Sequence, residues 1–118
     1  MTEQTTAVEP PAGTLTFLFT DVEGSTRLRQ EHPGAMAAAL SRHDEIMQAA
    51  ITTHQGYIFS TAGDAFAAAF ARPGDAISAA VEVQQGLSAE TWPSDVQILV
   101  RWGFTPARRP SEAVTTSD

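Results

Sequence analysis

The sequence contains no cysteine, so disulfide bonds and thiolate metal sites are both excluded. Basic residues are also scarce: Lys and Arg total 7 against 14 Asp and Glu, which gives a formal net charge of -7 at pH 7. Such a chain cannot neutralise phosphates over a wide surface. The composition therefore argues against a nucleic-acid-binding protein.

Long apolar runs are missing as well, because no stretch reaches the length needed to span a bilayer. The first residues lack both the basic start and the apolar core of a signal peptide. Residues 1–13 are polar and include Pro10-Pro11, so we expect a flexible segment there. These features predict a cytoplasmic protein with no membrane partner, and a length of 118 residues predicts one domain.

Apolar spacing predicts four strands and two long helices in the order β, α, β, β, α, β. The segment Ala65–Phe70 is rich in alanine, which favours a helix. Gly63 and Pro73 bound it too closely for a long helix, so we predict a strand. The expected elements before the hairpin are a strand from Thr14 to Asp21, a short helix capped by Ser25 or Thr26 and running toward Glu31, a helix from Ala35 to about Thr53, and a strand that begins at Tyr57-Ile58-Phe59 and leads to the Gly63-Asp64 turn. After the hairpin we expect a helix capped by Asp75 and reaching Leu87, and a strand from Val96 to Trp102 or Phe104.

This order favours an α+β fold, a ferredoxin-like βαββαβ antiparallel sheet with both helices on one face. Leu18 is apolar between Phe17 and Phe19, so the first strand is expected to be central and covered on much of both faces. In this topology the first strand runs antiparallel to the third. Asp21 and Asp64 are then neighbours, although they lie 43 positions apart in the chain.

Two neighbouring carboxylates repel one another unless a cation lies between them. Mg²⁺ or Mn²⁺, with water and nucleotide phosphates as further ligands, would relieve that repulsion. The segment Val22–Thr26 suits such a ligand, because Gly24 lets backbone N–H groups approach phosphate oxygens at a helix start. The alternative is that Asp21 only caps a helix and Asp64 only forms a turn. His43 also has two interpretations: it is a base or ligand, or it is a partly buried histidine packed at a helix surface.

Five segments resemble the class III adenylate/guanylate cyclase catalytic domain in its actinobacterial form, over roughly residues 13–103. They are TLTFLFTDVEGSTRL, HPGAM, RHDEIM, GYIFSTAGDAFAAAF and the later VRWGF. The resemblance implies a ferredoxin-like core and catalysis at the interface of a head-to-tail dimer. It also implies that two metal ions activate the ribose 3′-hydroxyl of ATP for attack on the α-phosphate, which releases pyrophosphate and forms cyclic AMP.

The resemblance assigns roles to particular residues. Asp21 and Asp64 match the two catalytic, metal-binding aspartates, and Val22 matches a backbone carbonyl ligand. Residues matching the nucleotide-binding positions are Glu23, Gly24, Ser25, Thr26 and Gly63. The implied cofactors are two Mg²⁺ or Mn²⁺ ions. The implied partners are a nucleoside triphosphate and either a second copy of the chain or a full-length cyclase.

Two departures from the family pattern bear on activity. Ser60 stands where many members carry a base-recognising lysine. The family also continues beyond its last matching strand with a second base-selecting residue, an asparagine and an arginine. We therefore expect a partial catalytic domain over residues 14–104, a disordered tail over residues 105–118, and impaired cyclase activity.

A frameshift would explain the tail. Deleting one base from codons for the family's Arg-Met-Gly-Leu-His-Thr-Gly-Glu-Ala segment yields residues 101–109 of this chain. The alternative is an ordinary divergent tail. A catalytically inactive metal-nucleotide-binding or dimerisation remnant is the second functional hypothesis, and a ferredoxin-like interaction domain unrelated to nucleotides is the third.

Overall fold

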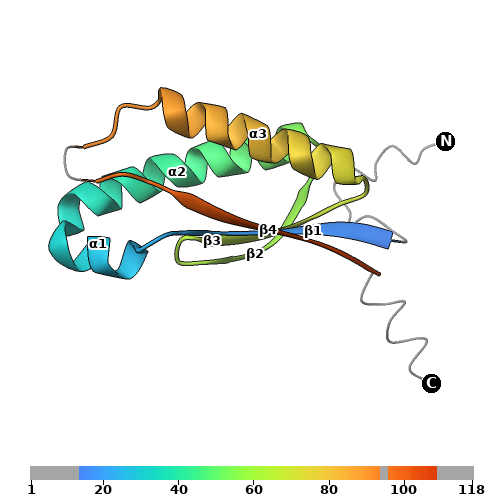
Figure 1. The fold of residues 1–118 in the computed structure, drawn as a ribbon, viewed down its shortest axis with the longest axis horizontal. Coiled ribbons are helices and arrows are strands. Elements are labelled where there is room, and N and C mark those ends of the chain that lie inside the picture. Colours follow the sequence, from blue (N-terminus) through green and yellow to red (C-terminus); the bar gives the residue numbers. More distant parts are fainter. Residues whose placement is uncertain (1–13, 94–95, 109–118) are drawn as a thin grey trace, which may run out of the picture.

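The computed structural model describes residues 14–93 and 96–108, so the predictions for residues 1–13 and 109–118 lie outside the described residues. Two long helices accompany four strands (Figure 1). In chain order the elements are β1 (Thr14–Val22), α1 (Ser25–Glu31), α2 (Pro33–Thr53), β2 (Tyr57–Ala62), β3 (Ala65–Phe70), α3 (Pro73–Ala89) and β4 (Val100–Arg108). None of the helices in these described segments combines the length and apolarity needed to cross a membrane.

The four strands form one sheet in the order β2-β3-β1-β4, and every neighbouring pair is antiparallel. This is the ferredoxin-like arrangement predicted from the element order, including the strand at Ala65–Phe70. Helices α2 and α3 lie together on one face of the sheet, and α1 lies at one end of it (Figure 1). Because β1 is central, its last residues meet both the start of β3 and the start of β4.

The core lies between the sheet and the two long helices. Its largest fully buried side chains are Leu18, Met36, His43, Met47, Ile51, Phe70 and Val83. No described helix covers the other face of the sheet, where Phe19 is 43% exposed and Phe59 is 46% exposed. The expectation that β1 is covered on much of both faces was wrong at Phe19, because alternate strand residues point to opposite faces and both long helices pack on the same one. Leu15, on the same face as Phe19, is nevertheless buried.

The last strand differs from its predicted range. It begins at Val100 rather than Val96, and it continues to Arg108, which pairs with Thr14. The first four residues of the predicted disordered tail, 105–108, therefore belong to a strand. Pairing with β1 uses backbone groups, so it does not require an apolar side-chain pattern. Pro106 is tolerated because β4 is an edge strand of the described sheet.

The predicted helix caps were also wrong. Helix α1 begins after Gly24, whose φ of 68° lets the chain turn directly out of β1, and no side chain caps this helix. Helix α3 begins after Arg72, while Asp75 lies in its first turn. Both long helices start with proline, at Pro33 and Pro73, where the missing N–H has no intrahelical partner to lose.

Gly56 provides a test of the packing between α2 and the sheet. A Cβ atom at this position would lie 2.6 Å from Ile51 Cγ2 and 2.6 Å from Phe70 Cζ, and both side chains are fully buried. We expect Gly56→Ala to lower the free energy of unfolding by about 1–3 kcal/mol, measured by urea denaturation. Gly74→Ala is the matched control, because a Cβ there meets nothing within 4 Å. Equal effects of the two substitutions would contradict this packing.

Candidate functional site

The fold brings Asp21 and Asp64 together at the end of the sheet next to α1. The backbone N–H of Val22 donates a hydrogen bond to Asp64 Oδ2 at 2.7 Å. Both aspartates line one cavity of about 550 Å³, which lies beside the start of α1. The antiparallel β1–β3 pairing brings them together. Thr20 lies opposite Phe66, so Asp21, which follows Thr20, and Asp64, which precedes Phe66, lie at the same end of the sheet. The topology predicted this proximity.

Asp21 is held by a guanidinium group. Arg101 lies directly opposite it in the β1–β4 register. Arg101 Nε donates to Asp21 Oδ1 at 2.9 Å and Arg101 Nη2 donates to Oδ2 at 3.1 Å. The hydrogen bond to Asp21 is the main reason that the pKa of Arg101 is raised, and the negative charge of Asp21 is the next cause. Desolvation opposes this rise, while the charges of Glu23 and Asp64 add to it.

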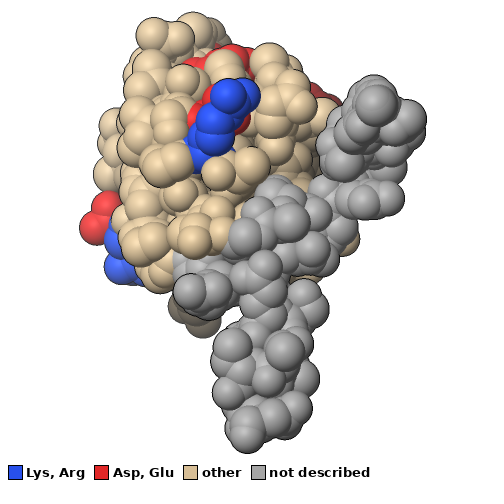
Figure 2. Space-filling model, turned by 90° about the vertical axis from the view of Figure 1, so that its right-hand side faces the viewer, with Lys and Arg blue, Asp and Glu red and all other residues tan. Residues whose placement is uncertain are grey.

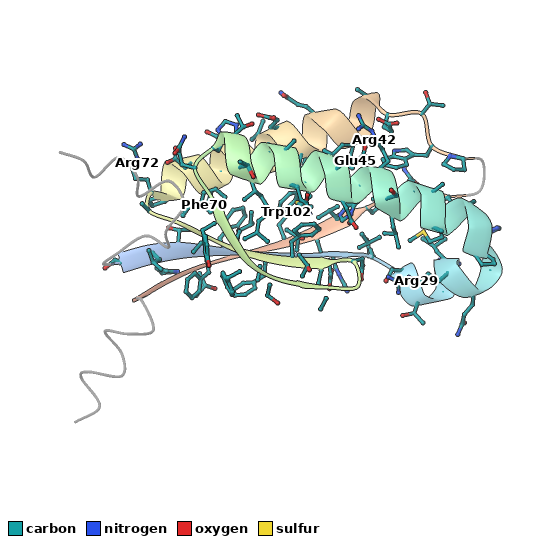
Figure 3. The ribbon with its side chains drawn as sticks, turned by 180° about the vertical axis from the view of Figure 1, so that it is seen from behind. Arg29, Arg42, Glu45, Phe70, Arg72 and Trp102 are labelled. Atoms are coloured by element: carbon teal, nitrogen blue, oxygen red, sulfur yellow. The ribbon has the colours of Figure 1, made fainter. Side chains whose placement is uncertain are left out.

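Asp64 is held more firmly than Asp21. Its side chain is 13% exposed and it accepts the hydrogen bond from the Val22 backbone. Arg29 of α1 places Nη2 3.7 Å from Asp64 Oδ1, and Figure 3 shows Arg29 on this helix at the end of the molecule. Gly63, with φ of 61°, allows the tight turn that precedes Asp64. Backbone geometry thus fixes this carboxylate.

The predicted nucleotide-binding residues divide into two groups. Gly24, Ser25 and Thr26 line the cavity that holds both aspartates, as does Val22. Glu23 and Gly63 are not among the described residues that line it. The backbone N–H of Glu23 instead donates to the Leu99 carbonyl at 2.8 Å, which ties the loop to the segment before β4.

The donor set fits a Mg²⁺-type ion that keeps water and phosphate ligands. Asp21 and Asp64 supply carboxylate oxygens, and Mg²⁺ commonly takes only one or two carboxylates from the protein. No group of three or more His, Cys, Asp or Glu side chains suited to a metal occurs within residues 14–93 and 96–108. An all-protein metal cage is therefore not the kind of site that these residues form.

A second cavity of about 590 Å³ adjoins the first and shares Asp21 and Arg101 with it. Phe19 and Phe59 are among the residues that line it, together with Ser60. Trp102 also belongs to the lining, but its indole Nε1 donates a hydrogen bond to Gln84 of α3 on the helix side of the sheet. Phe17 extends this aromatic cluster, with its ring centroid 5.6 Å from that of Phe59. The sequence contains no lysine at any position, so an ammonium group is not available to this cavity from the chain itself.

His43 lies in the core and is not among the residues that line either cavity. Its side chain has no exposed surface, its Nδ1 lies 2.8 Å from Asp44 Oδ1, and its ring centroid is 5.9 Å from that of Phe66. The structure thus places His43 as a packed histidine of α2, although it is fully buried in the core rather than partly buried at the helix surface as the structural interpretation expected.

Arg101 is the residue that the sequence interpretation missed. Its only signal was its position in the last strand, and its pairing with Asp21 depends on the β1–β4 register. The opposite end of the molecule is different in character, since Figure 2 shows few charged side chains on its described surface. Ion pairs that involve the candidate site, with Arg29 and Arg101, lie at the α1 end.

Comparison with known families gives one match that covers most of the chain. The model for the adenylate and guanylate cyclase catalytic domain matches residues 8–91. The adenylate cyclase of Lachancea kluyveri is 37% identical over 89 residues, which are 75% of this chain and 5% of the yeast protein. An uncharacterised protein of Mycobacterium bovis is 44% identical over 78 residues, covering 64% of this chain and 27% of that protein.

Solved structures of cyclase domains share the fold. Adenylate cyclases of Trypanosoma brucei in their monomeric state superpose with a TM-score of 0.78 at 24% identity, over 85% of this chain and 59% of theirs. The guanylate cyclase domain of Catenaria anguillulae in complex with GTP superposes with a TM-score of 0.68 at 19% identity, over 80% of this chain and 56% of that one. The chain thus spans a little over half of these solved domains and a small part of the curated fungal relatives.

Proposed function

Because this chain belongs to the adenylate and guanylate cyclase catalytic domain family, we propose that it binds a nucleoside triphosphate together with two divalent metal ions at Asp21 and Asp64. The observation that carries the proposal is the convergence of both carboxylates on one cavity, which Gly24, Ser25 and Thr26 also line. The proposed reaction is that of the family: the 3′-hydroxyl of ATP attacks the α-phosphate, and cyclic AMP and pyrophosphate form.

Each part of the cavity has a role in this proposal. Asp21 and Asp64 would hold the metal ions, and the backbone carbonyl of Val22 would be a further ligand. Bound Mg²⁺ or Mn²⁺ would supply Lewis-acid activation of the ribose hydroxyl and neutralise charge at the α-phosphate. The loop at Gly24–Thr26 orients the phosphates, since the absence of a Cβ at Gly24 allows close approach of the backbone.

The proposed substrate is ATP, and the adenine is held differently from the usual family pattern. The matching proteins of Lachancea kluyveri and Schizosaccharomyces pombe are both named adenylate cyclase. The solved Catenaria anguillulae domain binds GTP, so purine selection within the family depends on local contacts. At Ser60 a hydroxyl replaces the lysine of many members, and the neighbouring side chains are aromatic. Stacking on Phe19 or Phe59 would then contribute more than a charged contact.

Turnover is proposed to require a second subunit and to be weak for the chain alone. The open face with Phe17, Phe19 and Phe59 adjoins Asp21 and offers an apolar surface for a second copy or for a full-length cyclase. The guanylyl cyclase domain of a Blastocladiella emersonii fusion protein has been solved both as a dimer and as a monomer. A cytoplasmic location stays a prediction.

An inactive metal-nucleotide-binding module is the second candidate function. The observation that favours it is that both carboxylates already have arginine partners, Arg101 and Arg29. Measuring cyclic AMP formation from Mn²⁺-ATP by the purified chain separates the two functions. Formation that depends on Asp21 supports the enzyme, and nucleotide binding without product supports the module.

Asp64 substitutions test the proposed function by separating charge from hydrogen bonding. Asp64→Asn retains an oxygen that can accept the Val22 hydrogen bond, whereas Asp64→Ala removes it. We expect both variants to weaken Mn²⁺ binding by at least about 10-fold, measured by isothermal titration. Asp64→Ala should also lower the free energy of unfolding, by about 1–3 kcal/mol and more than Asp64→Asn does, because the partly buried Val22 N–H is then left without any acceptor. Unchanged Mn²⁺ affinity in both variants would refute a metal site at Asp64.

A further inference from the structure

Arg101 binds the two carboxylate oxygens of Asp21 that a metal ion would need as ligands. Both carboxylate oxygens accept hydrogen bonds from its guanidinium, at 2.9 Å and 3.1 Å. The contact is built into the sheet, because the two residues are directly opposite in the β1–β4 register. A metal ion and this guanidinium therefore compete for the same two oxygen atoms.

The ion pair between Arg101 and Asp21 lies where it can dissociate. The side chain of Arg101 is 63% exposed and that of Asp21 is 44% exposed, so water screens their attraction. A divalent cation attracts a carboxylate more strongly than a single guanidinium charge does at the same distance. Asp64 differs, since its side chain is only 13% exposed and is also held by the Val22 backbone.

A released Arg101 side chain would remain at the site. It lines the cavity with Gly24, Ser25, Thr26 and Asp64, and it also lines the adjoining aromatic cavity. Its planar group of N–H donors matches phosphate oxygens as well as it matches a carboxylate. A nucleoside triphosphate in this cavity would bring such oxygens within its reach.

We propose that Arg101 is a displaceable counter-ion of the site, which binds Asp21 in the absence of metal and transfers to the triphosphate when the metal-nucleotide complex binds. This inference rests on the proposed function, because it takes Asp21 as a metal ligand. It gives Arg101 a positioning role with two opposite consequences. Arg101 weakens binding of the free metal ion and strengthens binding of the metal-nucleotide complex.

The experiment compares Mn²⁺ binding with and without α,β-methylene-ATP, followed by electron paramagnetic resonance of free Mn²⁺. Arg101→Gln should bind Mn²⁺ alone about two- to fivefold more tightly than the unmodified chain, which is the range expected from losing an exposed ion pair. The same variant should bind the Mn²⁺-nucleotide complex about 10-fold more weakly, because a charged phosphate contact is lost. Arg101→Lys, which keeps the charge without the planar fork, should show smaller changes in both.

Arg42→Gln is the control for net charge. Arg42 pairs with Glu45 and Glu90 and lies on the helical layer, as Figure 3 shows, so its loss should alter neither affinity. If Arg101→Gln weakens Mn²⁺ alone, or leaves both affinities unchanged, the proposal is overturned while Asp21-dependent Mn²⁺ binding by the unmodified chain still supports the function. If neither the unmodified chain nor Arg101→Gln binds Mn²⁺, the proposed function itself is refuted.

Discussion

Replacing Asp21 by alanine should weaken binding of the Mn²⁺-ATP complex by on the order of 100-fold. Loss of a group that only supports a metal ligand commonly costs 10- to 100-fold in metal affinity, so loss of a ligand should reach at least the upper end of that range. Isothermal titration with α,β-methylene-ATP and Mn²⁺ measures the effect without depending on turnover.

The fold should survive this substitution. Asp21 is half-exposed and its side-chain partner is the exposed guanidinium of Arg101, so little buried structure depends on the carboxylate. Asp75→Ala is a matched control, since it also removes a partly exposed aspartate whose partner is an exposed arginine, Arg72. A thermal unfolding curve close to that of the unmodified chain, combined with unchanged nucleotide affinity, would rule out Asp21 as a metal ligand.

Replacing Phe70 by alanine should cost about 3–5 kcal/mol in the free energy of unfolding. Phe70 is fully buried at the end of β3, on the side of the sheet that the helices cover (Figure 3). It lies against the end of α2, where its ring approaches the backbone at Gly56. Truncation would leave a cavity that neither the sheet nor α2 can close, because both are fixed by backbone hydrogen bonds.

Phe59→Ala is the matched control for Phe70. Phe59 is 46% exposed on the open face of the sheet, so the same deletion of a ring should cost well under half as much. Urea denaturation of both variants provides the comparison. A larger loss for Phe59 than for Phe70 would mean that the core lies on the other face of the sheet.

The sheet topology could be predicted because it depends on coarse features. Apolar spacing at three and four residues marks the helices, and the Gly63-Asp64 turn marks the hairpin between β2 and β3. Once the order was known, few ways remained to bury the apolar faces. The proximity of Asp21 to Asp64 followed from the strand directions, and the structure places both on one cavity.

The details that could not be predicted depend on pairing partners. Arg101 contacts Asp21 only because of the β1–β4 register, and no local pattern around residue 101 encodes that register. The extension of β4 to Arg108 likewise depends on β1, which offers backbone partners as far as Thr14. Gly24, rather than Ser25 or Thr26, occupies the N-cap position of α1, because its left-handed backbone conformation turns the chain from β1 into the helix.

The frameshift hypothesis for residues 101–109 predicts that sequencing of the gene region would show a further cyclase segment in another frame. The structure indicates how much a change of side chains in this segment would disturb the sheet. Residues 101–108 lie in an edge strand whose pairing uses backbone atoms, and a Cβ atom at Gly103 would meet Phe19 only at an ordinary contact distance of 3.9 Å. A change of side chains there need not prevent β4 from forming.

The most direct test of a metal-nucleotide site at Asp21 and Asp64 is to locate bound Mn²⁺ by nuclear magnetic resonance. Paramagnetic Mn²⁺, added below stoichiometric amounts with α,β-methylene-ATP, should first broaden the backbone amide signals of Val22, Gly24 and Asp64. Signals from the start of α3, at the other end of the sheet, should stay sharp. Uniform broadening, or broadening centred away from the two aspartates, would contradict the proposed site.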